Sequence, residues 1–428
     1  MGEFTAAEWT RINALLDSDP ARYGFPARRD DSVILSSFNI RKLGTLSTKS
    51  DGAFRLLARY VKATDLLAIQ EIQDNLEALG FLKDLSGDRY GLAVSDVTGA
   101  IPGRDGLIER LGYLFRWDTI ERTEVASDIS YDRSAVQDNL LTHRLDFGEA
   151  LKAREVELAA FAADRELYEE AKAAKKRGED VEVPSEPEMP AFKLPHFLTF
   201  IRAPYCCSFR VKPLGAAEPY EFLAVNAHLL YGDASAQKAE RRAEFFALLD
   251  WIYTRVKKRD RTYHLNFILM GDLNLDFDDP VEDRREIEDF IKTIDQEFLK
   301  SKISARVNFP FFDAHPERGP NWPLPDGTPG PFRTNARLDQ TYDQIGLFAH
   351  DKRLPNHKAN AKAGSVEGGF DYGMFDFVRL FLDAMHGPDE TIDTLSSAQR
   401  KRFFAKFEHD FSDHMPIWIR LPKPRPGM

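Results

Sequence analysis

The stretch that decides the fold is Asn266-Phe267-Ile268-Leu269-Met270-Gly271-Asp272-Leu273-Asn274-Leu275-Asp276-Phe277. Its apolar run, residues 267–270, has no polar alternation, which is typical of a strand that is covered on both faces. Gly271 lets the backbone turn tightly, and the alternation of an extended chain predicts Asp272 and Asn274 on one side. A carboxylate beside a carboxamide can bind a metal ion, a water or a phosphate. Because strand-Gly-Asp also begins many ordinary turns, both interpretations stay open for this stretch alone.

The composition of the 428-residue chain indicates a soluble, globular protein with one large core or two ordinary ones, since 43% of residues are hydrophobic and 30% are charged. No apolar segment approaches the roughly 20 residues that span a bilayer, and the N-terminal residues show no secretion signal. The two cysteines, Cys206 and Cys207, are neighbours and too close for ordinary disulfide geometry. We therefore expect a cytoplasmic protein without a membrane span.

The formal net charge of −11 argues against broad electrostatic binding to nucleic acid. It does not exclude a nuclease, because a nuclease needs only a local basic footprint. A metal site rich in carboxylates also lowers the total charge by itself. Composition alone leaves this question open.

Strands and helices are predicted to interleave along the chain. We expect strands at 33–38, 66–70, 112–117, 197–201, 207–211, 221–226, 267–270 and 342–348. We expect helices at 5–18, 52–62, 147–175, 236–256, 284–297, 374–384 and 395–408, and a long loop at 305–335. This order favours an α/β sandwich of two sheets flanked by helices.

The predicted domain organisation has one interrupted domain. An N-terminal helical extension at 1–31 precedes a domain at 32–421, and a tail covers 422–428. The interruption is a helical, charged insertion at 147–195, which includes an acidic, Pro-rich loop. It is either a solvated helix packed on the body or a surface for a protein partner.

Several predicted strand ends carry an acid, amide or imidazole group. They are Asn39, Glu71, His228, Asp272, Asn274, Asp343, Asp413 and His414. Each one alone is most simply a turn cap, an ion pair or a hydrogen-bonded structural residue. The repetition of one arrangement favours a shared site.

The runs around these residues carry a family resemblance. They are Ser37-Phe38-Asn39-Ile40-Arg41, Leu67-Ala68-Ile69-Gln70-Glu71-Ile72, Glu109-Arg110-Leu111-Gly112-Tyr113-Leu114-Phe115-Arg116, Arg202-Ala203-Pro204, Val225-Asn226-Ala227-His228, Met270-Gly271-Asp272-Leu273-Asn274, Tyr342-Asp343-Gln344-Ile345 and Ser412-Asp413-His414-Met415-Pro416. In this order they resemble the endonuclease/exonuclease/phosphatase superfamily, and within it the deoxyribonuclease I-like group. The resemblance implies a four-layered α/β sandwich, two packed mixed β-sheets flanked by helices, to which this chain adds the helical insertion.

The resemblance also implies a metal site. Asn39, through its side-chain oxygen, Glu71 and Asp413 form a hard oxygen site suited to Mg²⁺, with Mn²⁺ or Ca²⁺ as alternatives. Cleavage of a phosphodiester requires charge neutralisation, an activated water and protonation of the leaving oxygen.

Two imidazole–carboxylate pairs are implied beside that metal. His414, backed by Asp343, would activate water and contact the phosphate, whereas His228, backed by Glu109, would protonate the leaving oxygen. Asp272 and Asn274 would orient water and stabilise the developing phosphorane. Which histidine is the base stays open, and the family chemistry leaves a 5′-phosphate and a 3′-hydroxyl.

Substrate contacts are implied for Arg41 and Arg202, which match family positions on the DNA backbone or minor groove, with structural ion pairs as the alternative. Leu107 replaces the groove-stacking tyrosine of the family, and Tyr231 is the candidate substitute. This replacement puts the preference for duplex DNA in doubt.

The sequence therefore predicts a Mg²⁺-dependent hydrolase, a DNA endonuclease in the first instance. One alternative is a phosphatase or phosphodiesterase of the same fold that acts on a lipid or a small phosphate. The other is a non-catalytic, nucleic-acid-binding scaffold.

Overall fold

The computed structural model describes residues 3–99, 108–129, 133–190, 192, 194–232, 235–258, 263–275, 282–318 and 327–428. The chain forms two compact units, each described separately below. The main unit comprises Met1–Asp96, Glu109–Ile129 and Pro204–Met428, and the second unit comprises Val97–Ile108 and Ser130–Ala203. The second unit is thus wider than the predicted insertion at 147–195. Among the described helices, none has the length and apolarity that crossing a bilayer requires.

The main unit contains two six-stranded sheets. The first has the spatial order β11 (Asp371–Met374), β12 (Ile417–Pro422), β1 (Ser32–Leu43), β2 (Leu66–Ile72), β4 (Arg110–Arg116) and β3 (Tyr90–Val94). The second has the order β5 (Ile120–Asp128), β6 (Tyr205–Val211), β7 (Tyr220–His228), β8 (Asn266–Asp272), β10 (Asp343–Ala349) and β9 (Arg306–Asn308). Both sheets are mixed, because β1 and β2 pair in parallel, as do β7 and β8, among antiparallel neighbours.

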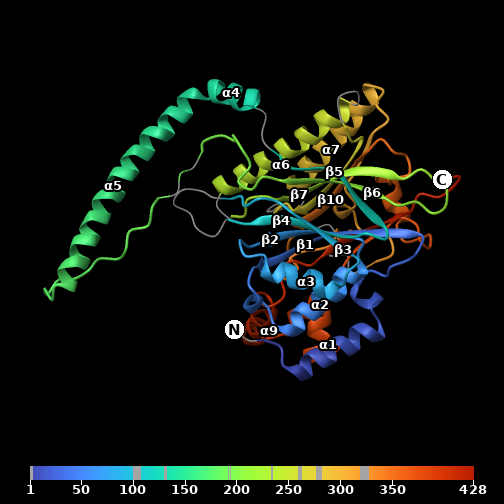
Figure 1. The fold of residues 1–428 in the computed structure, drawn as a ribbon, viewed down its shortest axis with the longest axis horizontal. Helices are drawn as coiled ribbons and strands as arrows, with labels where there is room; N and C mark the ends of the chain where they lie inside the picture. The colour runs from blue at the N-terminus through green and yellow to red at the C-terminus, as the bar shows by residue number, and fades with distance from the viewer. Residues whose placement is uncertain are drawn as a thin grey trace. The chain divides into compact units, whose positions relative to one another are not determined.

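Helices cover the outer faces of the two packed sheets (Figure 1). On the side of the first sheet lie α1 (Ala6–Ser18), α2 (Asp51–Ala63), α3 (Glu77–Ser86), α8 (Phe377–His386) and α9 (Ser397–Phe407). On the side of the second lie α6 (Ser235–Lys257) and α7 (Glu282–Lys300). Short 3₁₀ turns are η1 (Ala21–Tyr23), η2 (Leu46–Thr48), η4 (Pro310–Phe312), η5 (His357–Lys362) and η6 (Ile392–Thr394). The predicted four-layered sandwich is confirmed.

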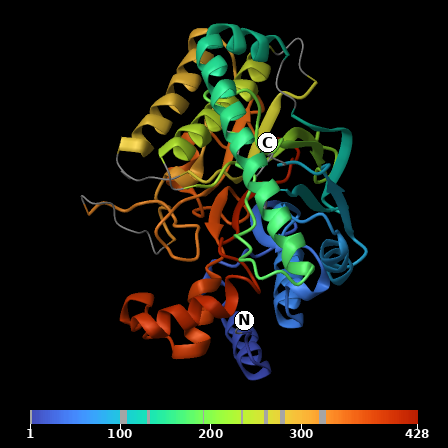
Figure 2. The ribbon, with the colours of Figure 1, turned by 90° about the vertical axis from the view of Figure 1, so that its left-hand side faces the viewer.

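The N-terminal helix α1 belongs to the main unit. Its first turn carries a capping box between Thr5 and Glu8, and its buried face presents Trp9, Ile12 and Leu16 to the core. Figure 2 shows α1 beside the C-terminal helices, and α1 contacts α8. The segment predicted as an extension at 1–31 therefore completes the helical layer of the first sheet.

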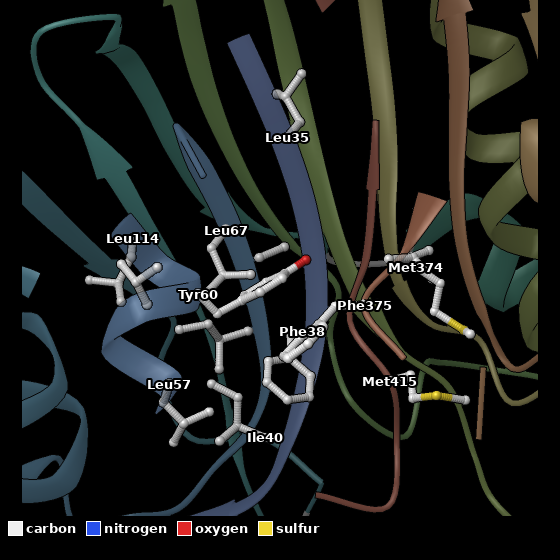
Figure 3. Packing of buried hydrophobic residues seen from close by; sticks show 14 of the residues in the cluster. Leu35, Phe38, Ile40, Leu57, Tyr60, Leu67, Leu114, Met374, Phe375 and Met415 are labelled. Atoms are coloured by element: carbon white, nitrogen blue, oxygen red, sulfur yellow. The ribbon is translucent and has the colours of Figure 1, made fainter. Parts of the chain in front are cut away.

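The core under β1 decides which side chains face the second sheet. Phe38 packs against Tyr60 of α2, with ring centroids 5.9 Å apart, and Tyr60 stacks on Phe375 at 5.7 Å (Figure 3). Since successive side chains of a strand point to opposite faces, burial of Phe38 on the helical side turns Asn39 toward the second sheet. Packing of the core thus orients a predicted site residue.

The predicted elements differ from the structure in several places, and the strands β3, β11 and β12 were not predicted. Residues 197–201 form no strand, although they are apolar; Phe197 and Phe200 pack on each other with centroids 5.3 Å apart. The loop predicted at 305–335 contains β9 and η4. Strand β5 escaped prediction because it is an edge strand of mostly exposed, polar residues, without the continuous apolar run of a central strand.

The second unit contains α4 (Arg133–Thr142) and α5 (Arg144–Lys176). The helix predicted at 147–175 is confirmed and begins three residues earlier. The helix ends at Lys176, and residues 179–190 continue without helix or strand.

Candidate active site

The carboxyl ends of the paired parallel strands bring the predicted groups together. Asn39 and Glu71 lie near the ends of β1 and β2, and His228 and Asp272 end β7 and β8. His228 is the register partner of Asp272, which is also paired with Asp343 of β10. Because β1 packs against β8, these ends form one cluster between the two sheets.

Asp272 is the centre of this cluster. Its Oδ2 accepts a hydrogen bond from Asn39 Nδ2 at 2.9 Å. The Nε2 atoms of His228 and His414 lie 3.5 and 3.4 Å from the same oxygen. Its other oxygen, Oδ1, accepts from the backbone N–H of Asn274 at 3.0 Å. Asp272 therefore joins an amide of the first sheet to both imidazoles.

Both predicted imidazole–carboxylate pairs are present. His228 Nδ1 lies 2.6 Å from Glu109 Oε1, and His414 Nδ1 lies 3.0 Å from Asp343 Oδ2. All four side chains are buried. In each pair the carboxylate holds one ring nitrogen, so that Nε2 is the nitrogen directed at Asp272.

The His414 pair is fixed by two hydroxyl groups that the sequence prediction missed. The backbone N–H of Asp343 donates to Thr334 Oγ1, and that of His414 donates to Ser412 Oγ, each at 3.0 Å. Ser412 Oγ in turn donates to the carbonyl of Asn39 at 2.6 Å. Ser412 belongs to the run Ser412-Asp413-His414-Met415-Pro416, so its role near His414 could have been predicted. Nothing in the sequence around Thr334 indicates its role.

The charges of the cluster shift the pKa values of its members. Burial disfavours the charged form of His414, but Asp272 and Asp343 outweigh it and raise the pKa of His414 well above its usual value. Burial raises the pKa of Asp343 to about 6, against the opposing effect of His414. Burial also opposes ionisation of Asp272, yet His414 and His228 hold its pKa below the usual value. At neutral pH the cluster contains an imidazolium between two carboxylates.

The predicted oxygen site lies beside this cluster. Glu71 accepts from Asn39 Nδ2 at its Oε1 and from the backbone N–H of Lys42 at its Oε2, both at 3.0 Å. Although burial opposes it, His228 and the Asn39 hydrogen bond hold the pKa of Glu71 below its usual value. Asp413 pairs with Arg41 through Oδ2 at 2.7 Å, while its Oδ1 is buried without a hydrogen-bond partner among the described residues.

Asn39 differs from its predicted role in one respect. Its side-chain oxygen, expected to bind the metal, accepts from the backbone N–H of Arg41 at 2.9 Å. The carboxamide nitrogen faces Glu71 and Asp272. Asn39 thus acts as a hydrogen-bond donor to two carboxylates. To bind a metal ion, its side-chain oxygen would use its second lone pair, or the carboxamide would rotate.

Strained backbone accompanies the site. Six described non-glycine residues have positive φ, and four of them are Arg41 (35°), Lys42 (52°), Glu71 (59°) and Asn274 (47°). Such conformations cost roughly 1–3 kcal/mol each and concentrate at functional sites. The prediction that strand alternation aligns Asp272 and Asn274 is wrong, because β8 ends at Asp272 and a left-handed Asn274 donates its Nδ2 to the carbonyl of Leu229.

The residues predicted to contact the substrate have different surroundings in the structure. Arg41 forms the ion pair with Asp413, which was the alternative for this residue. Tyr231 is exposed and lies 6.5 Å from the ring of Tyr342, itself 5.7 Å from the ring of His414. Arg202 is buried and belongs to the second unit. Leu107 lies outside the described residues.

Lys49 is a further residue that the sequence did not indicate. Its buried Nζ donates to the carbonyls of Arg41, His409 and Phe411 at 3.0, 3.2 and 3.1 Å. Burial lowers the pKa of Lys49 to about 8. The side chain ties the backbone that follows Asn39 to the backbone that precedes Asp413, so that both segments of the oxygen site are held together.

Comparisons with known proteins give distant structural likenesses. No family model and no curated protein sequence matches the chain. An endonuclease/exonuclease/phosphatase family protein from Bacteroides thetaiotaomicron has 14% identity and a TM-score of 0.41, over 92% of this chain and 95% of that one. Truncated TDP2 from Caenorhabditis elegans has 11% identity and a TM-score of 0.40, over 91% and 98%. A mannosyl-6-phosphatase from B. thetaiotaomicron has 12% and 0.40, over 91% and 98%.

Proposed function

We propose that the chain is a divalent-metal-dependent phosphoesterase that hydrolyses phosphodiester bonds of DNA to 5′-phosphate and 3′-hydroxyl ends. The observation that carries this proposal is the convergence of His228 and His414, each backed by a carboxylate, on Asp272. Such a pair of braced imidazoles offers proton donors and acceptors on two sides of one reacting phosphorus.

The oxygen donors beside the imidazoles suit a hard divalent cation. Glu71 and Asp413 supply carboxylates. The buried Oδ1 of Asp413 has no hydrogen-bond partner in the described part of the chain, and a cation would satisfy it. Asn39 supplies a neutral oxygen. The set fits Mg²⁺, with Mn²⁺ or Ca²⁺ as alternatives. When bound, the cation neutralises phosphate charge and lowers the pKa of water.

The protein groups divide the remaining work. His228, oriented by Glu109, delivers a proton to the leaving oxygen from Nε2. His414 has a raised pKa, which favours hydrogen bonding to a phosphate oxygen as the imidazolium over abstraction of a proton. Asp272, with its lowered pKa, accepts a hydrogen bond from the attacking water, and Asn274 holds Asp272 Oδ1 through its backbone N–H.

The choice of DNA depends on residues around the site. The exposed Tyr231 near Tyr342 offers a stacking surface for a base, which supports a nucleic acid. The Arg41–Asp413 ion pair and the net charge of −11 support the second candidate, a phosphatase or phosphodiesterase for a lipid or small phosphate at the same site. The unbridged thiols of Cys206 and Cys207 support a cytoplasmic location.

The deciding experiment incubates the chain, with and without Mg²⁺, with 5′- and 3′-labelled single- and double-stranded DNA and with an inositol phosphate panel. We expect Mg²⁺-dependent DNA cleavage to 5′-phosphate ends. Turnover of inositol phosphates alone would favour the second candidate, and no turnover of either would favour a non-catalytic scaffold. The variant His357→Ala is the control, because that histidine is 71% exposed and lies outside the cluster.

A further inference from the structure

A second group of metal-ligating side chains lies within the second unit. His143, Asp146 and His196 each offer one ligand atom, and these atoms all lie within 4.8 Å of one another. The three residues belong to Ser130–Ala203, so that the group is independent of the active-site cluster. The function proposed above uses none of them.

The start of α5 presents two of these side chains together. His143 is the residue that precedes the helix, and Asp146 stands three positions later in its first turn. Residues at this spacing lie on one side of a helix. His143 Nδ1 and Asp146 Oδ2 are 3.7 Å apart. This edge is close to the roughly 3.3–3.5 Å that separates ligands bound tetrahedrally at about 2.1 Å.

The third side chain comes from the segment that returns after the helix. His196 Nε2 lies 2.6 Å from the same oxygen, Asp146 Oδ2. The rings of His143 and His196 stack with centroids 3.6 Å apart and an interplanar angle of 23°. The two imidazoles therefore approach one carboxylate oxygen side by side.

The surroundings hold these groups in place. The ring of Phe147 packs edge-on against His196, with centroids 5.8 Å apart. Asn139 of α4 donates its Nδ2 to the carbonyl of Phe197, the residue after His196. The side chains are one-third to one-half exposed, which leaves an open path for an ion.

We propose that His143, Asp146 and His196 form a Zn²⁺ site that fastens the returning segment at 194–198 to the start of α5. Two imidazole nitrogens and one carboxylate oxygen are typical zinc ligands, and water completes the tetrahedron. On binding, Asp146 and His196 separate by somewhat less than about 1 Å to reach the tetrahedral edge. The site goes beyond the proposed hydrolysis, since it is structural and lies in the other unit.

The test measures the number of zinc ions bound by the metal-free 428-residue chain with a chromophoric zinc indicator, and uses Co²⁺ absorption as a spectroscopic probe. We expect the double variant His143→Gln/His196→Gln to bind one equivalent fewer than the wild type and to lose a tetrahedral Co²⁺ band. Asp146→Asn keeps the hydrogen-bonded geometry and should weaken this equivalent at least about tenfold. His357→Gln should change nothing.

The same measurements separate this proposal from the active site. Mg²⁺-dependent turnover should be unchanged in both ligand variants, the double variant His143→Gln/His196→Gln and Asp146→Asn, and the zinc equivalent should persist in His414→Ala. Circular dichroism of each variant confirms that the fold is retained. Equal zinc stoichiometry in the wild type and the folded double variant would overturn the proposal, as would loss of the equivalent in His357→Gln.

Discussion

His228 and His414 direct their Nε2 atoms at one and the same oxygen, Oδ2 of Asp272, at 3.5 and 3.4 Å. One imidazole ends β7, and the other follows the last helix of the chain. Their opposite ring nitrogens are held by Glu109 and Asp343. The two rings therefore form one charge-coupled centre, and the effects of changing them should not be independent.

Removal of either imidazole should abolish most of the hydrolysis. We expect His228→Ala and His414→Ala each to lower kcat/KM at least about 100-fold, because each removes a proton-transfer or phosphate-contacting group. The double variant should lose much less than the product of the single losses, since residues that act as a unit are non-additive. Steady-state cleavage of labelled DNA measures all three, with His357→Ala as the control. Full activity in both single variants would contradict the assigned roles.

Gly271 should tolerate no side chain. Its φ is 158°, and a Cβ atom there would lie 1.9 Å from the carbonyl oxygen of Ala227 on the neighbouring β7. We expect Gly271→Ala to destabilise the protein by about 3 kcal/mol, since overpacking a buried strand costs roughly 1–3 kcal/mol and the backbone cannot yield easily. Urea unfolding measures the change.

The matched control is Gly80→Ala. Gly80 lies inside α3, and an added Cβ would meet no atom within 4 Å. Alanine is favoured over glycine in a helix by up to about 1 kcal/mol, so this variant should be neutral or more stable. Equal effects of the two substitutions would show that the contact with Ala227 does not restrict position 271.

The buried strands were predictable because a strand covered on both faces has a continuous run of apolar residues. β8 is buried along its length, and the apolar run 267–270 forms its centre. The tight turn expected at Gly271 is absent, because Gly271 lies inside the strand and pairs with Ala227 and Gln344. The chain order of the strand-end motifs predicted the two imidazole pairs by resemblance, and both are present. Register then places His228 and Asp343 beside Asp272.

Other features could not be predicted, because they depend on long-range geometry. Asn274 leaves the strand in a left-handed conformation, which a strand pattern does not encode. Strand β5 alternates in exposure at a sheet edge and lacks an apolar run. Lys49 donates hydrogen bonds to the carbonyls of His409 and Phe411, more than 300 residues away in sequence, and no motif around Lys49 indicates these contacts.

Lys49 should be required to hold the oxygen site together. Lys49→Met removes three hydrogen bonds, which Lys49 Nζ donates to the carbonyls of Arg41, His409 and Phe411. We expect a loss of about 3 kcal/mol in stability, because a buried carbonyl without a partner costs roughly 1–3 kcal/mol. In the folded variant the Mg²⁺ concentration for half-maximal activity should rise at least about fivefold, since Arg41 and Asp413 lose their common support.

Lys300→Met is the control for this substitution. Lys300 is 70% exposed and pairs only locally with Glu297 among the described residues. Its replacement should change stability by less than about 0.5 kcal/mol. If folded Lys49→Met needs the same Mg²⁺ concentration as the wild type, Lys49 contributes to the stability of the fold and not to the metal site.

The charge of His414 should appear in the pH dependence of stability. Its pKa is raised in the folded protein by Asp272 and Asp343, against the effect of burial, so that the imidazolium stabilises the native state. This contribution is complete below the unfolded pKa of about 6.5 and is lost as pH rises through the higher folded value. Relative to His414→Gln, the wild type should therefore be most stabilised near pH 6.5, above the value of about 6 for Asp343, and progressively less as pH rises above 6.5. Urea unfolding in chelator-containing buffer measures the difference, and titration of Lys49 near pH 8, common to both proteins, cancels. A difference that stays constant or grows with pH would show that His414 is neutral in the native protein.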